Sequence, residues 1–202
     1  MRRIWFPFLG LVAVLTVAGC DVPNLGSGGS GTPGESGSTP IATLNAPAGS
    51  CHYAAHFTPD IACTPGVADS RVTQDNLQST ICASGWSTSV RPPVGVTEPI
   101  KVERMKAYGN SGQSLAGYEL DHLIPIEVGG ASDVGNLWPQ PADPTPGYHQ
   151  KDALENGIHK LVCEGQLSLA DGQKAFSVNW YTAYEKYCVE QTGICFAYGS
   201  GS

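Results

Sequence analysis

The sequence is poor in charge, and above all in positive charge. Only 14% of its 202 residues are charged, with 11 Lys and Arg against 18 Asp and Glu, and the net charge is −7. So few cations exclude a basic, histone-like or ribosomal-type protein, because such proteins neutralise phosphate with Lys and Arg. The low charge also excludes a coiled coil, which would be rich in Ala, Glu, Lys and Leu. The hydrophobic share of 41% is nevertheless enough for a globular core.

Long apolar runs are also missing, except for one at the start of the chain. Residues 4–18 carry no charge, but the run is too short to span a membrane comfortably. Two arginines precede it and small residues lead from it to Cys20, a pattern that resembles a bacterial lipoprotein signal. The resemblance implies that Cys20 becomes the lipid-modified first residue of an extracytoplasmic protein anchored to the bacterial cell membrane. The alternative is an ordinary secretory signal, cleaved near Ala18 or Gly19.

The chain divides into three predicted parts. A signal peptide covers residues 1–20. Residues 21–50 are rich in Gly, Ser, Pro and Thr and show no apolar periodicity, which is typical of a flexible linker. The globular domain then covers residues 51–202. The two arginines of the signal balance the two acidic residues of the linker, so the whole net charge of −7 falls on the globular domain.

Six of the seven cysteines lie in the globular domain. They form no CxxC pair and no close Cys/His cluster, which argues against a zinc site. An even number in an exported protein predicts three disulfides, and six cysteines allow fifteen pairings. Short local loops favour the set Cys51–Cys63, Cys188–Cys195 and, from what remains, Cys82–Cys163. The last bridge would contribute about 4 kcal/mol by loop entropy.

Apolar spacing, caps and breakers predict an α+β domain built around one core. The expected helices are 73–82, 100–108, 149–163 and 168–187. The expected strands are 118–126, of which at least the first half is extended, and 136–138. Residues 84–99 are rich in Pro and Gly and are expected to be irregular.

One stretch combines a carboxylate, an imidazole, two adjacent glycines and an amide at close spacing. It reads YELDHLIP at 118–125, GG at 129–130 and NLWP at 136–139. This stretch resembles the HNH endonuclease family, whose active site is a ββα-metal motif. With the KDxLE pattern at 151–155 and the segments 80–82 and 90–93, it is similar to a group of exported bacterial HNH-type proteins. The resemblance covers roughly residues 64–187 and implies an HNH core with flanking helices, stapled by disulfides.

The resemblance assigns a role to each matching residue. His122 is the general base, a task for which a neutral histidine is suited at pH 7. Asp121 is a metal ligand, and Asn136 holds the connecting loop so that the His122 ring stays oriented. The third family position lies at the start of the following helix, where His149 is the best match. It follows Asn136 by 13 residues, more than in compact family members, because the loop 139–147 contains four prolines.

Further residues belong to the predicted site. Glu119 and Glu155 are candidates to support the ligands or to act as alternative ligands, and Arg91 and Lys151 are candidates for contact with phosphate. The implied cofactor is a divalent metal ion, Mg²⁺ in first place with Mn²⁺ or Zn²⁺ as alternatives. The implied partners are a nucleic acid, DNA before RNA, and the membrane, while the sequence indicates no protein partner.

The predicted function is metal-dependent endonucleolytic hydrolysis of nucleic acid outside the cytoplasm, and two alternatives stay open. An acidic domain suits a catalytically inactive HNH-fold surface lipoprotein that acts as a binding module, since nonspecific affinity for DNA comes from Lys and Arg. A hydrolase of another phosphate ester or of a wall polymer is the other. Single residues also have plain structural interpretations: Lys151, for example, could be a solvated helix lysine that pairs with Glu155 at i,i+4.

Overall fold

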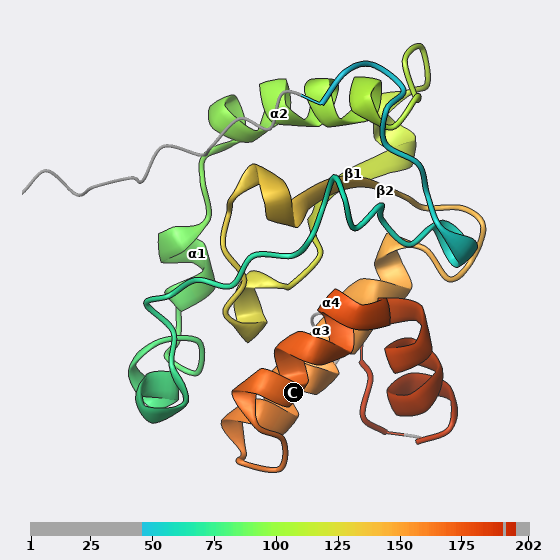
Figure 1. Ribbon diagram of the computed structural model, residues 1–202. Coiled ribbons are helices and arrows are strands. Elements are labelled where there is room, and N and C mark those ends of the chain that lie inside the picture. The colour runs from blue at the N-terminus through green and yellow to red at the C-terminus, as the bar shows by residue number, and fades with distance from the viewer. Residues whose placement is uncertain (1–45, 192, 197–202) are drawn as a thin grey trace, which may run out of the picture. The chain divides into compact units, whose positions relative to one another are not determined.

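Helices and one small antiparallel sheet make up the fold, which confirms the α+β class (Figure 1). The structure is a computed structural model that describes residues 46–191 and 193–196, so the predicted signal, Cys20 and nearly all of the linker lie outside the described residues. The main elements are α1 Trp86–Val90, α2 Val94–Ala107, β1 Tyr118–His122, β2 Leu137–Pro141, α3 Tyr148–Cys163 and α4 Leu169–Tyr184. None of the helices in the described ranges is both long and apolar enough to cross a bilayer.

The two strands form a hairpin whose faces pack on different helices. β1 pairs antiparallel with β2, and His122 lies opposite Leu137. Because neighbouring side chains of a strand point to opposite faces, Leu137 packs with Ile100 of α2, whereas Trp138 lies in the main core. A sheet of two strands has only edge strands, so β2 can include Pro139 without losing a required hydrogen bond.

Helix α2 begins earlier than its sequence predicts. The prediction that residues 84–99 are irregular is wrong, because they contain α1 and the first turns of α2. Pro93 directly precedes α2 with φ −65°, a value suited to the start of a helix. Pro99 lies inside α2 and removes one hydrogen bond, to the carbonyl of Gly95. Gly95 is exposed, so water can satisfy that carbonyl.

A buried arginine fixes α2 to the hairpin. Arg104 is 1% exposed. Its Nε donates to the carbonyl of Leu137 at 3.0 Å, and its Nη2 donates to the carbonyl of Cys63 and the hydroxyl of Thr64, both at 2.9 Å. A hydrocarbon side chain could not make these bonds, so Arg104 positions α2 against both β2 and the segment that precedes α1.

Helices α3 and α4 pack on each other and cover the other side of the hairpin (Figure 1). The predicted helix 149–163 is confirmed, as is most of the predicted helix 168–187, which continues past α4 as a π-helical turn, Glu185–Val189. The hydroxyl of Ser168 caps α4 by accepting a hydrogen bond from the backbone N–H of Asp171 at 3.1 Å. The largest completely buried apolar side chains of this core include Trp138, Leu154, Ile158, Phe176 and Trp180.

Three disulfides staple the domain: Cys51–Cys63, Cys82–Cys163 and Cys188–Cys195. These are the pairs that short local loops favour. The predicted helix 73–82 is a 3₁₀ helix, Gln74–Ser79, and the second bridge ties the segment after it to the end of α3. Three disulfides indicate that the protein folds in an oxidising compartment outside the cytoplasm.

Candidate active site

His122 is the last residue of β1, and its ring lies just beneath the surface. The residue is 7% exposed. Its Nε2 lies 3.0 Å from Oγ of Ser132, a partly exposed residue of the segment that joins the strands. Burial, with the nearby charges of Arg91 and Lys151, lowers the pKa of His122 to about 3. The imidazole is therefore neutral at physiological pH, the form that a general base requires, although a pKa this far below 7 also makes it a weak proton acceptor in this state of the protein.

Asn136 holds the segment between the strands. It is completely buried. Its Oδ1 accepts from the backbone N–H groups of Ile124 at 2.9 Å and Val67 at 3.3 Å. Its Nδ2 donates to the carbonyls of Ile124 at 2.8 Å and Ala131 at 2.9 Å. These bonds connect the backbone just after His122 to the residue just before Ser132, so both ends of the His122–Ser132 pair are fixed to one amide.

The glycine pair lets this segment fold back on the end of β1. Gly129 has φ +76°, a conformation that favours glycine. A Cβ on Gly130 would lie 1.7 Å from the carbonyl oxygen of Ile124, far inside contact distance. Backbone geometry thus requires the GG of the sequence motif, which lies seven and eight residues after His122.

Asp121 lies on the face of the hairpin that meets α3, where it contacts a buried lysine. Its Oδ2 forms an ion pair with Lys151 Nζ at 2.7 Å. Lys151 is 0% exposed and also contacts Glu155 Oε1 at 2.5 Å and donates to the carbonyl of His122 at 2.8 Å. The expected pairing of Lys151 with Glu155 is present, but the lysine is not solvated. Its ammonium makes two hydrogen bonds, to Glu155 and to the His122 carbonyl, and one ion-pair contact to Asp121 Oδ2, an oxygen that has no hydrogen-bond partner in the described part of the chain. Because it is completely buried among these oxygens, it is not placed to contact a phosphate.

Further carboxyl groups surround this lysine, and their pKa values are raised. Burial, followed by the charges of Asp121 and Asp152, raises the pKa of Glu119 to about 7. Burial likewise raises the pKa of Asp121 and, well above its usual range, that of Glu155. Burial alone would lower the pKa of Lys151, but the adjacent negative charges raise it, so the ammonium stays charged.

The other two predicted residues, Arg91 and His149, are exposed. Arg91 is exposed, and its Nη2 lies 3.4 Å from Oε1 of Glu127. His149 is exposed in the first turn of α3, with its ring centre 4.2 Å from that of Tyr148. No hydrogen bond or ion pair within the described ranges joins His149 to Asp121.

Sequence reasoning missed three residues near His122. The charge of Glu127 contributes to the raised pKa of Asp121, and the charge of Asp121 contributes to the raised pKa of Asp152. Ser132 contacts the imidazole of His122 itself. Asp152 belongs to the KDxLE pattern and could have been weighed with Glu155. Neither Ser132 nor Glu127 has a spacing that marks it, because a loop's path decides which of its side chains return to a strand end.

One group of potential metal ligands in the described residues lies elsewhere in the molecule. In residues 46–191 and 193–196, the three side chains with ligand atoms all within 4.8 Å of one another are Cys82, His159 and Cys163. This group has a geometry that could hold a metal ion. However, its two cysteines are joined as a disulfide, not present as the thiolates that bind metals, and Nε2 of His159 lies 2.9 Å from the carbonyl oxygen of Ile81.

The surroundings of Asp121 do not favour a divalent metal ion, because the ammonium of Lys151 already lies against its carboxylate. The described carboxylates and histidines near it form no group of three converging ligands. A positive side chain already occupies the face of Asp121 that points to α3. The metal assigned to Asp121 and His149 from the sequence therefore stays a prediction, and in residues 46–191 and 193–196 no contact brings these two side chains together.

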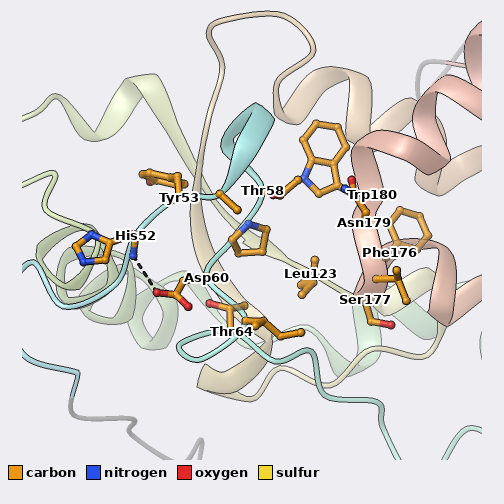
Figure 2. A pocket seen from close by; sticks show the side chains of 14 residues that line it. His52, Tyr53, Thr58, Asp60, Thr64, Leu123, Phe176, Ser177, Asn179 and Trp180 are labelled. Carbon is orange, nitrogen blue, oxygen red and sulfur yellow. Dashed lines mark hydrogen bonds between the residues drawn. The ribbon is translucent and has the colours of Figure 1, made fainter.

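A cavity of about 460 Å³ opens beside the site. It lies between the segment around His52–Thr64 and α4, and Figure 2 shows Leu123, Phe176 and Trp180 among its lining side chains. Leu123 directly follows His122, but His122, Asp121 and Lys151 do not line the cavity. The ion-pair residues thus lie outside the cavity, but Phe176, which lines it, also has its ring centre 5.3 Å from Lys151 Nζ.

Comparison with known proteins identifies no relative: no family model, no curated protein and no solved structure matches the chain.

Proposed function

We propose that the protein is an extracytoplasmic endonuclease that hydrolyses phosphodiester bonds of nucleic acid, DNA in first place, with His122 as the general base. The observation that carries the proposal is the position of His122. It is a neutral, nearly buried imidazole at the end of β1. Its Nε2 lies beside the hydroxyl of partly exposed Ser132, and its backbone carbonyl accepts a hydrogen bond from Lys151.

The order of the elements supports the same proposal. A hairpin of β1 and β2 is followed directly by α3, and α3 contributes a side chain that contacts the end of β1. This is the order of a ββα motif as in the HNH family, which the sequence around Asp121–His122 and Asn136 resembles. The fourfold hydrogen bonding of Asn136 gives it the loop-holding role that the family assigns to this position.

The proposed reaction uses water as nucleophile. His122 accepts a proton from the water as its oxygen forms the new bond to phosphorus, and the bond from phosphorus to the leaving sugar oxygen breaks. The leaving oxygen takes a proton from solvent. Exposed Arg91 is the group that can contact the phosphate directly and offset the negative charge that develops. The charge of buried Lys151 is taken up by Asp121 and Glu155.

The proposed reaction does not include a metal ion. The resemblance implies Mg²⁺ held by Asp121 and His149, where it would stabilise charge on the phosphate. Because the ammonium of Lys151 already pairs with Asp121, no step of the hydrolysis is assigned to a metal.

The location is proposed on two grounds. The disulfides indicate folding outside the cytoplasm. The sequence around Cys20 resembles a lipoprotein signal, so we propose that the mature chain is held at the membrane by lipid on Cys20. A diacylated and N-acylated cysteine has enough chains for stable anchoring.

The test compares the full chain with His122→Ala on plasmid DNA, in buffers that contain either Mg²⁺ or EDTA. Loss of the general base should slow cleavage about 10²–10⁴-fold. His52→Ala is the matched control, since His52 is an exposed histidine outside the site, and it should cut like the wild type. A wild type that cuts no faster than His122→Ala in every buffer contradicts the proposal. Tight binding of DNA without cleavage would instead favour the binding module.

A further inference from the structure

Lys151 is completely buried, and three oxygens surround its ammonium. It lies in the first turns of α3 and is 0% exposed. Its ammonium meets Asp121 Oδ2 at 2.7 Å, Glu155 Oε1 at 2.5 Å and the carbonyl oxygen of His122 at 2.8 Å. Two of its three N–H donors are hydrogen-bonded, to Glu155 and to the carbonyl of His122. Asp121 Oδ2 lies at ion-pair distance from the ammonium, and it has no hydrogen-bond partner among the described residues. Its other close neighbour is the ring of Phe176, with Nζ 5.3 Å from the ring centre.

These three oxygens are of the kinds that hard metal ions take. Carboxylates and a backbone carbonyl are ligands of Mg²⁺ and related cations. Here two elements, β1 and α3, bring them to one point, but the helix also contributes the cation itself. A divalent ion bound to Asp121 Oδ2 would lie next to the ammonium of Lys151. Both are positive, and repulsion between like charges is weakly screened in a buried site, so the ammonium disfavours the metal ion.

We propose that the ammonium of Lys151 is the resident cation of this site and takes the place of a divalent metal ion. It neutralises the carboxylate of Asp121 and holds the backbone of His122 by its carbonyl. The consequence for catalysis rests on the proposed nuclease function: cleavage by this chain should not require a divalent metal. The consequence for metal binding does not rest on it.

The first test uses the wild-type full chain. Cleavage of plasmid DNA should persist in EDTA, and added Mg²⁺ or Mn²⁺ should change its rate by less than about threefold, whereas loss of a catalytic metal removes several kcal/mol of charge stabilisation. Titration with Mn²⁺, followed by calorimetry and by the melting temperature, should show no site that depends on Asp121, as judged against Asp121→Asn.

The second test removes the built-in cation. Lys151→Ala leaves Asp121 and Glu155 facing an open space, so this variant should melt at a lower temperature and should gain a Mn²⁺ site that raises its melting temperature. The double variant Lys151→Ala with Asp121→Asn should not gain it. Lys160→Ala is the matched control, because Lys160 also pairs at i,i+4 on α3, with Glu164, but is exposed. It should neither lose stability appreciably nor gain a metal site.

The outcomes separate the two proposals. Cleavage that needs a divalent ion, together with a wild-type Mn²⁺ site lost in Asp121→Asn, overturns the resident-cation proposal and leaves the nuclease standing. Absence of cleavage in every buffer overturns the nuclease, and the Mn²⁺ titrations then decide on Lys151 alone. If Lys151→Ala does not fold, the wild-type titration still decides, since an Asp121-dependent metal site in the wild type contradicts the proposal.

Discussion

Glu119 is a half-buried carboxyl group on β1, and its surroundings destabilise its charged form. Burial has the largest effect, and the negative charges of Asp121 and Asp152 add to it, so the pKa of Glu119 rises from 4.5 to about 7. Between these two values the folded chain holds a proton on Glu119 that the unfolded chain has released. Folding stability therefore falls as pH rises through this window. The contribution is fully present below about pH 4.5 and is lost above pH 7.

Glu119→Gln should remove this dependence. The amide has nearly the same shape and cannot ionise, so the melting temperature of the variant relative to wild type should rise between pH 5 and pH 8. Thermal unfolding of both chains at the two pH values measures the change. Glu103→Gln on α2 replaces an exposed carboxyl and should show a constant difference. If the relative melting temperature of Glu119→Gln stays constant or falls, the raised pKa is not correct.

At the scale of single residues, the sequence indicates which residues belong to the candidate site better than it indicates what their side chains contact. The Asp-His pair and Asn136 are recognisable because each lies in a short motif, and the structure shows Asn136 bonded to the loop after His122. Lys151 was expected to touch phosphate, yet it is buried and paired. A lysine's position in a motif does not specify whether its four-carbon stem runs outward or inward, because that depends on the strand end that α3 happens to cover.

At the scale of elements, the loop between β1 and β2 depends on one position without a side chain. Gly130 approaches the carbonyl of Ile124 so closely that a Cβ would lie 1.7 Å from its oxygen. Its N–H also donates to the carbonyl of Pro125 at 2.7 Å, and it pairs with Ala68 in an isolated bridge. The loop cannot keep these contacts and accept a methyl group.

Gly130→Ala should therefore destabilise the fold by about 3 kcal/mol or more, as expected when an overpacked site must shift backbone. Because the shift lies in the loop that carries Ser132, DNA cleavage should fall as well. Gly117→Ala is the matched control, since a Cβ there meets nothing within 4 Å, and it should stay within about 0.5 kcal/mol of wild type. Urea unfolding measures both variants. Equal stability of the two variants would show that the loop can relax around Gly130.

The elements themselves were predictable to the extent that periodicity controls them. Helices α3 and α4 carry apolar residues at helical spacing, and both lie within a few residues of their expected bounds. The error at residues 84–99 came from treating prolines as evidence of irregular chain. Pro93 starts α2, and Pro99 is accommodated where the unpaired carbonyl faces water. A proline's effect depends on its place in the helix and on solvent exposure, which composition does not reveal.

At the scale of the whole molecule, disulfides add to the hydrophobic core in holding the helices in place. Helix α3 is held at both ends: Lys151 joins its first turns to β1, and Cys163 at its last residue joins Cys82. The site therefore depends on a helix that cannot slide or swing away from the hairpin without breaking an ion pair or a disulfide. This arrangement explains how a chain with few charges can keep a buried lysine aligned with two carboxyl groups.

The three bridges should differ in their contribution according to the loops they close. Cys82–Cys163 spans 81 residues and Cys188–Cys195 spans 7. Loop entropy then gives about 4–5 kcal/mol for the long bridge and about 2–3 kcal/mol for the short one. Replacing both cysteines of the long bridge by alanine should thus lower the urea midpoint much more than replacing both cysteines of the short bridge. The long-bridge variant should also release the end of α3, so hydrogen exchange along α3 should speed up, whereas the short-bridge variant should leave it protected. Equal midpoints, or an unchanged exchange rate in α3, would mean that packing rather than the disulfide fixes this helix.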